Sequence, residues 1–358
     1  MTKYFEFPSG RCLGPGKTAA LCFAACIFFA AFSIGAEHPL RTWTNAEGRK
    51  IQARLVSLEG ESVKLDMAGR VYTVPIGSLS QADQDHLKEI VRKIEAPHQD
   101  ARKGSFSMAL THRMFSDPDD FYDTDIGKPT RKAIKQRDED PIAPIRYDSA
   151  KESARVYVPA HYDGSPAFGV YIHISPGDEP NMPQGYTQVM DRHDLIMASP
   201  AKGGNKQLVI RRISLALDTL ATLKADYAID LDRVYIGGLS GGGITAMQAQ
   251  LLHPEIWCGA LSHARGMVMG KFDEEYYSET KTFDKNDFRK ASRVDVRYAV
   301  LSGPDDWNYD HCVSSSKAWE DDGFDIRFFD IASMGHENAP PGAFEEALVW
   351  VAESKRKR

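Results

Sequence analysis

Polar and apolar residues alternate with a period of two from Arg41 onward, a pattern typical of half-buried β-strands. The alternation is clearest over 50–55 and 62–65, and glycines stand at the intervening turns. Ser80-Gln81-Ala82-Asp83 has the form of a capping box, which predicts a short helix running towards Arg92. The segment from Arg41 to Arg92 is long enough to form only a small barrel. Its four strands are predicted over about 41–44, 50–57, 62–67 and 70–74.

A different pattern begins at Tyr147, where apolar runs alternate with stretches of helical period. This alternation predicts a mostly parallel sheet covered on both faces by helices. One apolar stripe from Ile213 to Leu223 marks a helix over roughly 206–227, and further helices are expected over 244–252 and 341–353. The strands are expected over 153–158, 169–174, 194–198, 233–237, 258–262, 297–302 and 326–331.

The first 36 residues are expected to direct export. Basic residues precede an uncharged run from Thr18 to Ala36, which ends in small residues before Glu37. This pattern indicates a cleaved signal peptide, and a membrane anchor is the alternative because a spanning helix needs about 20 apolar residues. We therefore expect a periplasmic or extracellular protein.

Charge and cysteine content narrow the class of protein further. Among 358 residues, 44 Lys+Arg and 50 Asp+Glu give a net charge of −6, which argues against a nucleic-acid binder. Removal of a signal would leave only Cys258 and Cys312 of the five cysteines. In an oxidising compartment these two form either a disulfide or a pair of buried thiols, and the sequence leaves both open.

Four parts of the chain follow from these patterns. Residues 1–36 form the signal or anchor, 38–97 the small β domain, 98–146 a linker that wraps the next domain, and 147–358 the catalytic domain. The linker contains an acidic cluster over 116–125, but the order of ligands found in an EF-hand is absent. No metal site and no cofactor are expected.

The sharpest chemical signal is Gly238-Leu239-Ser240-Gly241-Gly242, which fits the G-x-S-x-G nucleophile elbow. An apolar strand precedes it and a helix follows, as that motif requires. Three successive glycines are poor helix formers, so close approach of the backbone explains them better than local folding does. Ser240 is therefore the candidate nucleophile.

A serine nucleophile needs an imidazole base and a carboxylate that orients the imidazole. In folds that contain a nucleophile elbow, the carboxylate follows the serine along the chain and the histidine follows the carboxylate. Asp306 lies in the segment that directly follows the strand over 297–302 and is our choice for the acid, with Asp305 as the alternative. His336 lies in a glycine-bearing loop after the last strand and is the candidate base. We expect His173, His253 and His311 to be structural.

The oxyanion intermediate needs two backbone amides. The amide of Gly241, directly after the nucleophile, supplies the first. The second should come from the strand-end loop over 173–178, where we choose Ser175 and keep Gly177 as the alternative, since Pro176 has no amide hydrogen.

These motifs make residues 147–358 resemble the α/β-hydrolase superfamily, nearest to secreted esterases of the polyhydroxybutyrate depolymerase and feruloyl esterase type. The resemblance implies an α/β-hydrolase fold and ester cleavage. Two departures are the His173-Ile174 pair, where relatives have His-Gly, and the small room for a cap insertion, which implies an open site for bulky or polymeric esters. The matching segments are 157–159, 171–177, 230–235, 238–242, 303–306 and 335–336.

The small β domain resembles the SH3-like SLA-one homology domain, through Arg41-Thr42-Trp43-Thr44 and Val74-Pro75-Ile76. That resemblance implies an accessory or cell-surface contact, with an inert stability module as the alternative.

We therefore expect an exported serine hydrolase that cleaves carboxylic esters through an acyl-enzyme, on a substrate attached to polysaccharide, polyester or a small alcohol. A serine peptidase with the same triad and a non-catalytic polysaccharide-binding scaffold are the alternatives. The sequence fixes neither acyl specificity nor oligomeric state.

Overall fold

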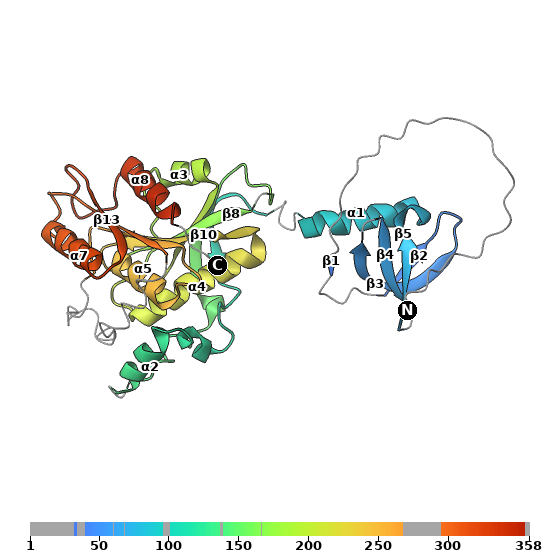
Figure 1. The fold of residues 1–358 in the computed structure, drawn as a ribbon, viewed down its shortest axis with the longest axis horizontal. Helices are drawn as coiled ribbons and strands as arrows, with labels where there is room; N and C mark the ends of the chain where they lie inside the picture. Colours follow the sequence, from blue (N-terminus) through green and yellow to red (C-terminus); the bar gives the residue numbers. More distant parts are fainter. Residues whose placement is uncertain are drawn as a thin grey trace. The chain divides into compact units, whose positions relative to one another are not determined.

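The structure is a computed structural model with two compact units, Met1–Glu95 and Ala96–Arg358 (Figure 1). Most of the predicted export segment lies outside the described residues, although Phe32–Ser33 form a short strand. Within the described ranges no helix is long and apolar enough to cross a membrane. These ranges are 32–33, 40–59, 61–67, 69–95, 101–136, 139–165, 167–267 and 295–354.

The first unit is an antiparallel sheet with one α-helix, α1 (Gln81–Glu95). Its strand order is β1-β3-β4-β5, and β2 pairs with β3. Trp43, Val63 and Leu65 are buried in its core because alternate residues of each strand face inward. The predicted strands are confirmed, and the Ser80 hydroxyl accepts a hydrogen bond from the amide of Asp83 at the start of α1. The other elements are β1 (Phe32–Ser33), β2 (Arg41–Thr44), β3 (Lys50–Glu59), β4 (Ser62–Met67), β5 (Arg70–Pro75) and η1 (Ile76–Ser78).

The second unit is built on an eight-stranded sheet of order β13-β12-β11-β10-β8-β9-β7-β6. β7 runs antiparallel to both of its neighbours, and the other pairs of described strands are parallel. The mostly parallel sheet predicted from the sequence is thereby confirmed. Its strands are β6 (Gly104–Ala109), β7 (Ser153–Val158), β8 (Phe168–Ile174), β9 (Leu195–Pro200), β10 (Ile229–Leu239), β11 (Gly259–His263), β12 (Arg297–Ser302) and β13 (Asp325–Asp330).

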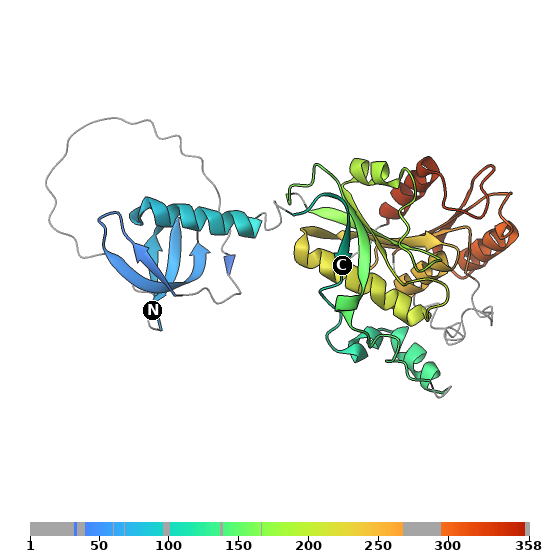
Figure 2. The same cartoon turned by 180° about the vertical axis from the view of Figure 1, so that it is seen from behind.

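Helices cover both faces of this sheet, as Figures 1 and 2 show from opposite sides. One face packs against α4 (Val209–Asp226), α5 (Gly241–Leu252) and α7 (Tyr309–Asp321), and the other against α3 (Tyr186–His193) and α8 (Pro341–Ala352). The residues of β8 alternate between the two cores: Val170 and Ile172 face the first, and Tyr171 faces the second. The remaining elements are η2 (Pro118–Tyr122), α2 (Gly127–Gln136) and η3 (Ser149–Lys151).

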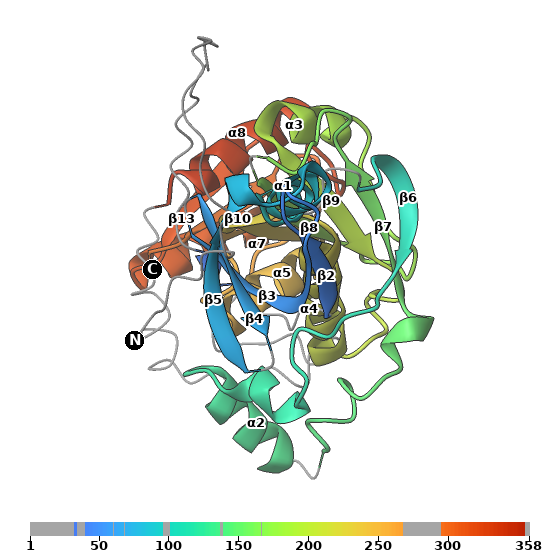
Figure 3. The same cartoon turned by 90° about the vertical axis from the view of Figure 1, so that its right-hand side faces the viewer.

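The segment predicted as a linker, 98–146, is corrected by the structure. From residue 101 onward, its described residues belong to the second unit, where β6 pairs with β7 at the edge of the sheet (Figure 3). Phe121, Tyr122 and Ile126 are buried in the main core. The segment is therefore part of the folded domain, because its sparse apolar side chains are covered by contacts distant in sequence.

Of the two alternatives for Cys258 and Cys312, the disulfide is corrected by the structure, in which both residues are buried thiols. Cys258 lies in the core beneath α8, whereas Cys312 lies in the core on the opposite face of the sheet. Burial raises the pKa of the Cys312 thiol to about 11, so the thiol stays protonated and unreactive at neutral pH.

Candidate functional site

Ser240 occupies the turn between β10 and α5 in a strained backbone conformation. Its φ of 55° and ψ of −121° lie in a region that residues with a side chain rarely adopt. The amide of Ser240 donates a hydrogen bond to the carbonyl of His263, at 2.8 Å, which fixes the turn to the neighbouring strand β11. The half-buried hydroxyl is thus held at the C-terminal edge of the sheet.

Glycine is required on both sides of Ser240 because the end of β8 lies against the turn. A Cβ on Gly242 would lie 2.0 Å from the carbonyl oxygen of Ile174, and one on Gly238 would lie 2.5 Å from the same atom. Both distances are far below a van der Waals contact. The close approach inferred from the three glycines is therefore present, and its partner is the backbone at Ile174.

The strand register brings the predicted acid to the same edge. Leu239 is paired with His263, His263 with Leu301, and Leu301 with Phe329, so four parallel strands end level with one another. The loops that carry Ser240, Asp306 and His336 therefore leave the sheet side by side. Ligand and catalytic sites form at this edge of parallel sheets.

Asp306 and His336 are brought together directly. The Nδ1 atom of His336 lies 2.9 Å from Oδ1 of Asp306, and because a carboxylate only accepts, Nδ1 is the protonated nitrogen. Asp306 is 3% exposed, whereas Asp305 is exposed to solvent. Of the two sequence candidates for the acid, the structure thus pairs Asp306 with the imidazole.

Two further donors fix the Asp306 carboxylate. The hydroxyl of Ser302 donates to Oδ2 at 2.7 Å, and the amide of Asn308 donates to Oδ1 at 2.9 Å. The Asn308 side chain in turn donates to the carbonyl of Ala264, at 3.0 Å. Sequence reasoning missed Ser302 and Asn308, although both lie within four residues of Asp306. These contacts set the direction in which Asp306 meets the imidazole.

Ser240 and His336 are not joined by a hydrogen bond in this structure, whose described residues include both. The loop of His336 is nevertheless tied to the sheet edge beside Ser240: the amide of Ala339 donates to Nδ1 of His263, the residue whose carbonyl holds the Ser240 amide.

The other histidines singled out from the sequence occupy structural positions. His311 contacts the carbonyl of Gly266 through Nε2 at 3.0 Å, and the buried His253 contacts Glu255 through Nδ1 at 3.2 Å. His173 is buried beneath the site, and burial lowers its pKa to about 3. It is therefore neutral throughout the physiological range.

Arg212 ties the elbow to the loop after β8. Its side chain is 1% exposed and comes from the first turn of α4. Nη1 donates to the carbonyl of Gly241 and Nη2 to the carbonyl of Ser175, each at 3.1 Å, while Nε donates to the carbonyl of Gly203 at 2.6 Å. One guanidinium thus fixes the two residues predicted to form the oxyanion hole. No sequence signal separated this arginine from the surface residues of a helix.

Ser175 and Gly177, the alternatives for the second oxyanion donor, differ in their surroundings. The amide of Gly177 donates to the hydroxyl of Ser175 at 3.1 Å, so that amide is already engaged, and Gly177 is exposed. Ser175 is 6% exposed and is held through its carbonyl by Arg212. Ser175 therefore stays our choice for the second donor, as a prediction.

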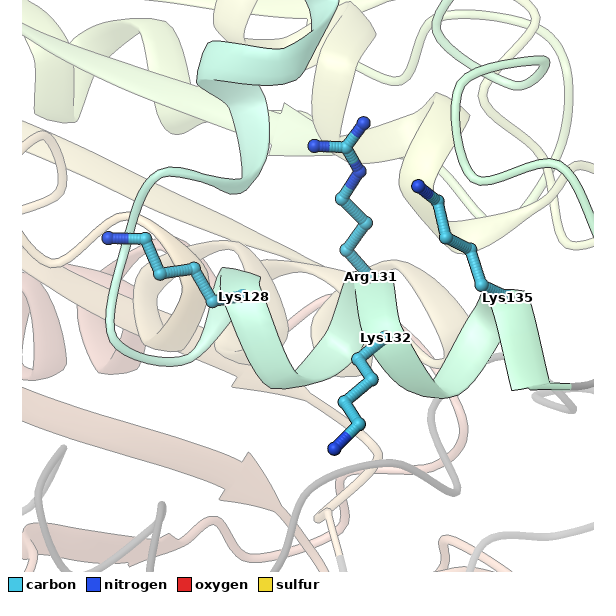
Figure 4. A pocket seen from close by; sticks show the side chains of 4 residues that line it. All are labelled: Lys128, Arg131, Lys132 and Lys135. Atoms are coloured by element: carbon cyan, nitrogen blue, oxygen red, sulfur yellow. The ribbon is translucent and has the colours of Figure 1, made fainter.

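A separate surface hollow of about 390 Å³ lies on α2 and includes none of the predicted site residues. It is lined by Lys128, Arg131, Lys132 and Lys135, which Figure 4 shows projecting from one short helix in different directions. Lys128 is paired with Asp123 at 2.7 Å and Arg131 with Asp119 at 2.6 Å. Two of its four cations are thus already neutralised by carboxylates on the preceding segment.

Comparison with known proteins gives distant structural similarities only. No protein-family model and no curated protein matches the chain. Solved structures that resemble it include a ferulic acid esterase (18% identity, TM-score 0.44, covering 56% of this chain and 91% of that one). An S-formylglutathione hydrolase from Agrobacterium tumefaciens has 16% identity and a TM-score of 0.41 over 57% of this chain and 90% of its own. Est1E from Butyrivibrio proteoclasticus has 15% identity and a TM-score of 0.43 over 56% and 93%. At these values the likeness by itself assigns no activity.

The class of fold follows from the chain's own topology. A mostly parallel eight-stranded sheet, helices on both faces and a strand–serine–helix turn fit the α/β-hydrolase fold expected from the sequence. Its site combines a strained serine with a buried carboxylate bound to a histidine.

Proposed function

We propose that this protein is a serine hydrolase that cleaves carboxylic esters through an acyl-enzyme. The observation that supports it most is the placement of Ser240, in a strained turn, on the sheet edge where Asp306 binds Nδ1 of His336. Strain of this kind persists only when the surrounding structure imposes it, and it is concentrated at functional sites. Ester cleavage uses all three side chains without a metal or cofactor.

The tautomer of His336 explains how the nucleophile would be activated. With its proton on Nδ1 held by Asp306, the imidazole presents an unprotonated Nε2 that can accept the proton of Ser240. The serine oxygen then bonds to the ester carbonyl carbon. As the bond to the alcohol breaks, Nε2 returns the proton to the departing oxygen. Water repeats the sequence on the acyl-enzyme and releases the acid.

Two backbone amides would stabilise the negative charge that develops on the carbonyl oxygen. We assign them to Gly241 and Ser175, whose carbonyls Arg212 holds from behind. Donors that are fixed in advance do not have to reorient while the negative charge develops in the transition state. Electrostatic stabilisation of this kind is the largest single contribution to catalysis in many enzymes.

The test compares hydrolysis of 4-nitrophenyl acetate by the wild type and by Ser240→Ala. Loss of turnover in the variant supports the proposal, and equal rates would eliminate it. Labelling by a fluorophosphonate at Ser240 separates a catalyst from an inert binding scaffold. Peptide substrates with free and blocked N-termini, assayed beside the ester, would reveal a peptidase instead.

For the N-terminal unit, we propose an SH3-like barrel that contacts cell-surface or wall polymer. Its antiparallel sheet has a core of its own around Trp43, and none of the predicted catalytic residues lies in it. Deletion of 38–97 should weaken retention on cells or insoluble polysaccharide while ester hydrolysis continues. Unchanged retention would leave the unit as a stability module.

We also propose that the protein is exported, on the basis of the uncharged run from Thr18 to Ala36. Expression in a bacterial host, followed by fractionation and N-terminal sequencing, tests this. A mature chain that starts near Glu37 in the periplasm or medium is the expected result. An uncut chain in the membrane fraction would indicate an anchor, and one in the cytoplasm would overturn the proposal.

A further inference from the structure

Trp307 is the most exposed large apolar side chain among the described residues, at 73%. Trp43, Trp257 and Trp319 are each at most 1% exposed. The indole of Trp307 is stacked on the ring of His336, with ring centroids 4.3 Å apart and planes inclined by 29°. A large aromatic surface is thus presented to solvent directly beside the proposed general base.

The backbone on either side of Trp307 is held by buried, hydrogen-bonded neighbours. Both neighbours, Asp306 and Asn308, are 3% exposed and joined by the hydrogen bond from the Asn308 amide. The Asn308 side chain also accepts a hydrogen bond from Arg265 at 2.8 Å. Tryptophan usually stabilises a fold because its indole is buried. The indole of Trp307 is exposed and contributes little in this way, so its exposure favours a role in binding.

The position beside His336 identifies the part of the substrate that Trp307 would meet. In the proposed mechanism His336 gives its proton to the departing alcohol oxygen, so the alcohol portion of the ester must lie next to the imidazole. The indole of Trp307 is stacked on that imidazole and is largely exposed. An aromatic surface therefore lies beside the base that the alcohol portion must approach.

We infer that Trp307 is a stacking platform for the alcohol portion of the substrate, and that this portion is a neutral pyranose ring of a carbohydrate ester. This inference rests on the proposed function and narrows its substrate class. A pyranose has an apolar C–H face and a rim of hydroxyls. Stacking on an exposed indole covers only the apolar face and leaves the hydroxyls hydrated, whereas an apolar alcohol would need an enclosed pocket.

The charges nearby indicate a neutral sugar. Asp305, before the acid, and Glu337, directly after His336, are both exposed. Exposed carboxylates that adjoin Asp306 and His336 along the chain would repel a uronate and can accept hydrogen bonds from sugar hydroxyls.

The experiment uses two acetyl esters that share an acyl group and differ in the alcohol: methyl β-D-xylopyranoside monoacetate and propyl acetate. The ratio of kcat/KM for the sugar ester to that for propyl acetate is measured for the wild type, Trp307→Ala and Trp307→Phe. In Trp307→Ala this ratio should fall about tenfold, equivalent to about 1.4 kcal/mol. Trp307→Phe should keep most of it, because a smaller aromatic face remains.

Val349→Ala, which truncates an exposed apolar side chain on α8, is the matched control and should leave the ratio unchanged. An unchanged ratio in Trp307→Ala would overturn the inference. So would an equal loss on both esters with a shifted pH profile, since Trp307 would then only position His336. If fluorophosphonate labels the wild-type protein but the protein does not hydrolyse the sugar ester, the inference of a sugar substrate is wrong and the proposed serine hydrolase function is not affected. Protein inert to both esters and to the label would refute the proposed function itself.

Discussion

Arg212 provides the sharpest test of the proposed oxyanion hole. Its guanidinium donates to three carbonyls that belong to different segments, those of Ser175, Gly203 and Gly241. Arg212→Lys keeps the positive charge and most of the volume but replaces a planar fork by a single ammonium. A lysine at this position can reach one or two of these carbonyls at best.

The size of the effect follows from those contacts. A hydrogen bond that involves a charged group contributes about 1.5–3 kcal/mol, so losing two sets an upper limit of about 3–6 kcal/mol on destabilisation. The free energy of unfolding of a domain is about 5–15 kcal/mol, so a domain near the middle of this range would still fold at 25 °C after this loss, and the urea unfolding below checks that it does. If one oxyanion amide loses its alignment, kcat should fall by about 10²-fold, as when such a donor is removed. KM should change little, because the donors act on the transition state.

The assay is steady-state hydrolysis of 4-nitrophenyl acetate, with urea unfolding of the same preparations. Arg211→Lys is the matched control: Arg211 precedes Arg212 on α4 but pairs with Glu152 at 2.9 Å, away from both oxyanion residues. This control should keep the wild-type kcat. A folded Arg212→Lys protein with wild-type kcat would refute the reasoning, and reduced stability with normal kcat would make Arg212 a purely structural residue.

Three further predictions concern other parts of the site and its support. Asp306→Asn should lower kcat for 4-nitrophenyl acetate about 10⁴-fold, because an amide no longer selects the tautomer of His336; a loss below tenfold would contradict this. Gly242→Ala should give insoluble or poorly folded protein by circular dichroism, since its Cβ would lie 2.0 Å from the oxygen of Ile174; soluble, active protein would contradict the close approach. The pKa of Glu345 is lowered to about 2, chiefly by the hydrogen bond that Arg192 of α3 donates to it. The stability that this pair contributes is complete above pH 4.5 and lost as pH falls towards 2, so urea midpoints measured from pH 5 to 2 should fall less steeply in Glu345→Gln.

Much of the fold could be predicted because its strands carry their own signal. The buried part of β10 (234–238) and the strand β12 are short apolar runs, and the antiparallel strands of the first unit alternate between polar and apolar residues. β6 gave no such signal. Its sequence, GSFSMA, is small and weakly apolar, and it is a strand only because β7 offers a free edge. The same holds for α2, whose polar sequence lies against the main core through Ile134.

The predicted site residues share one property: each stands at a strand end whose order along the chain can be read. Ser240, Asp306 and His336 follow β10, β12 and β13 in turn. The residues that hold them in place lack this property. Ser302 resembles any strand residue, and Arg212 is a polar residue in a helix, so nothing local distinguishes them from structural positions. Their roles exist only as contacts between segments distant in sequence.

The glycines and Arg212 act on the same piece of backbone from two sides. The carbonyl of Ile174 occupies the space that Gly238 and Gly242 leave open, and the carbonyl of the next residue, Ser175, is held by Arg212. The same guanidinium holds Gly241, directly after the serine. The end of β8 can therefore shift only if the elbow shifts with it. This coupling links the two residues that we propose as oxyanion donors to each other and to the turn of Ser240, and it depends on the buried arginine as well as on the glycines.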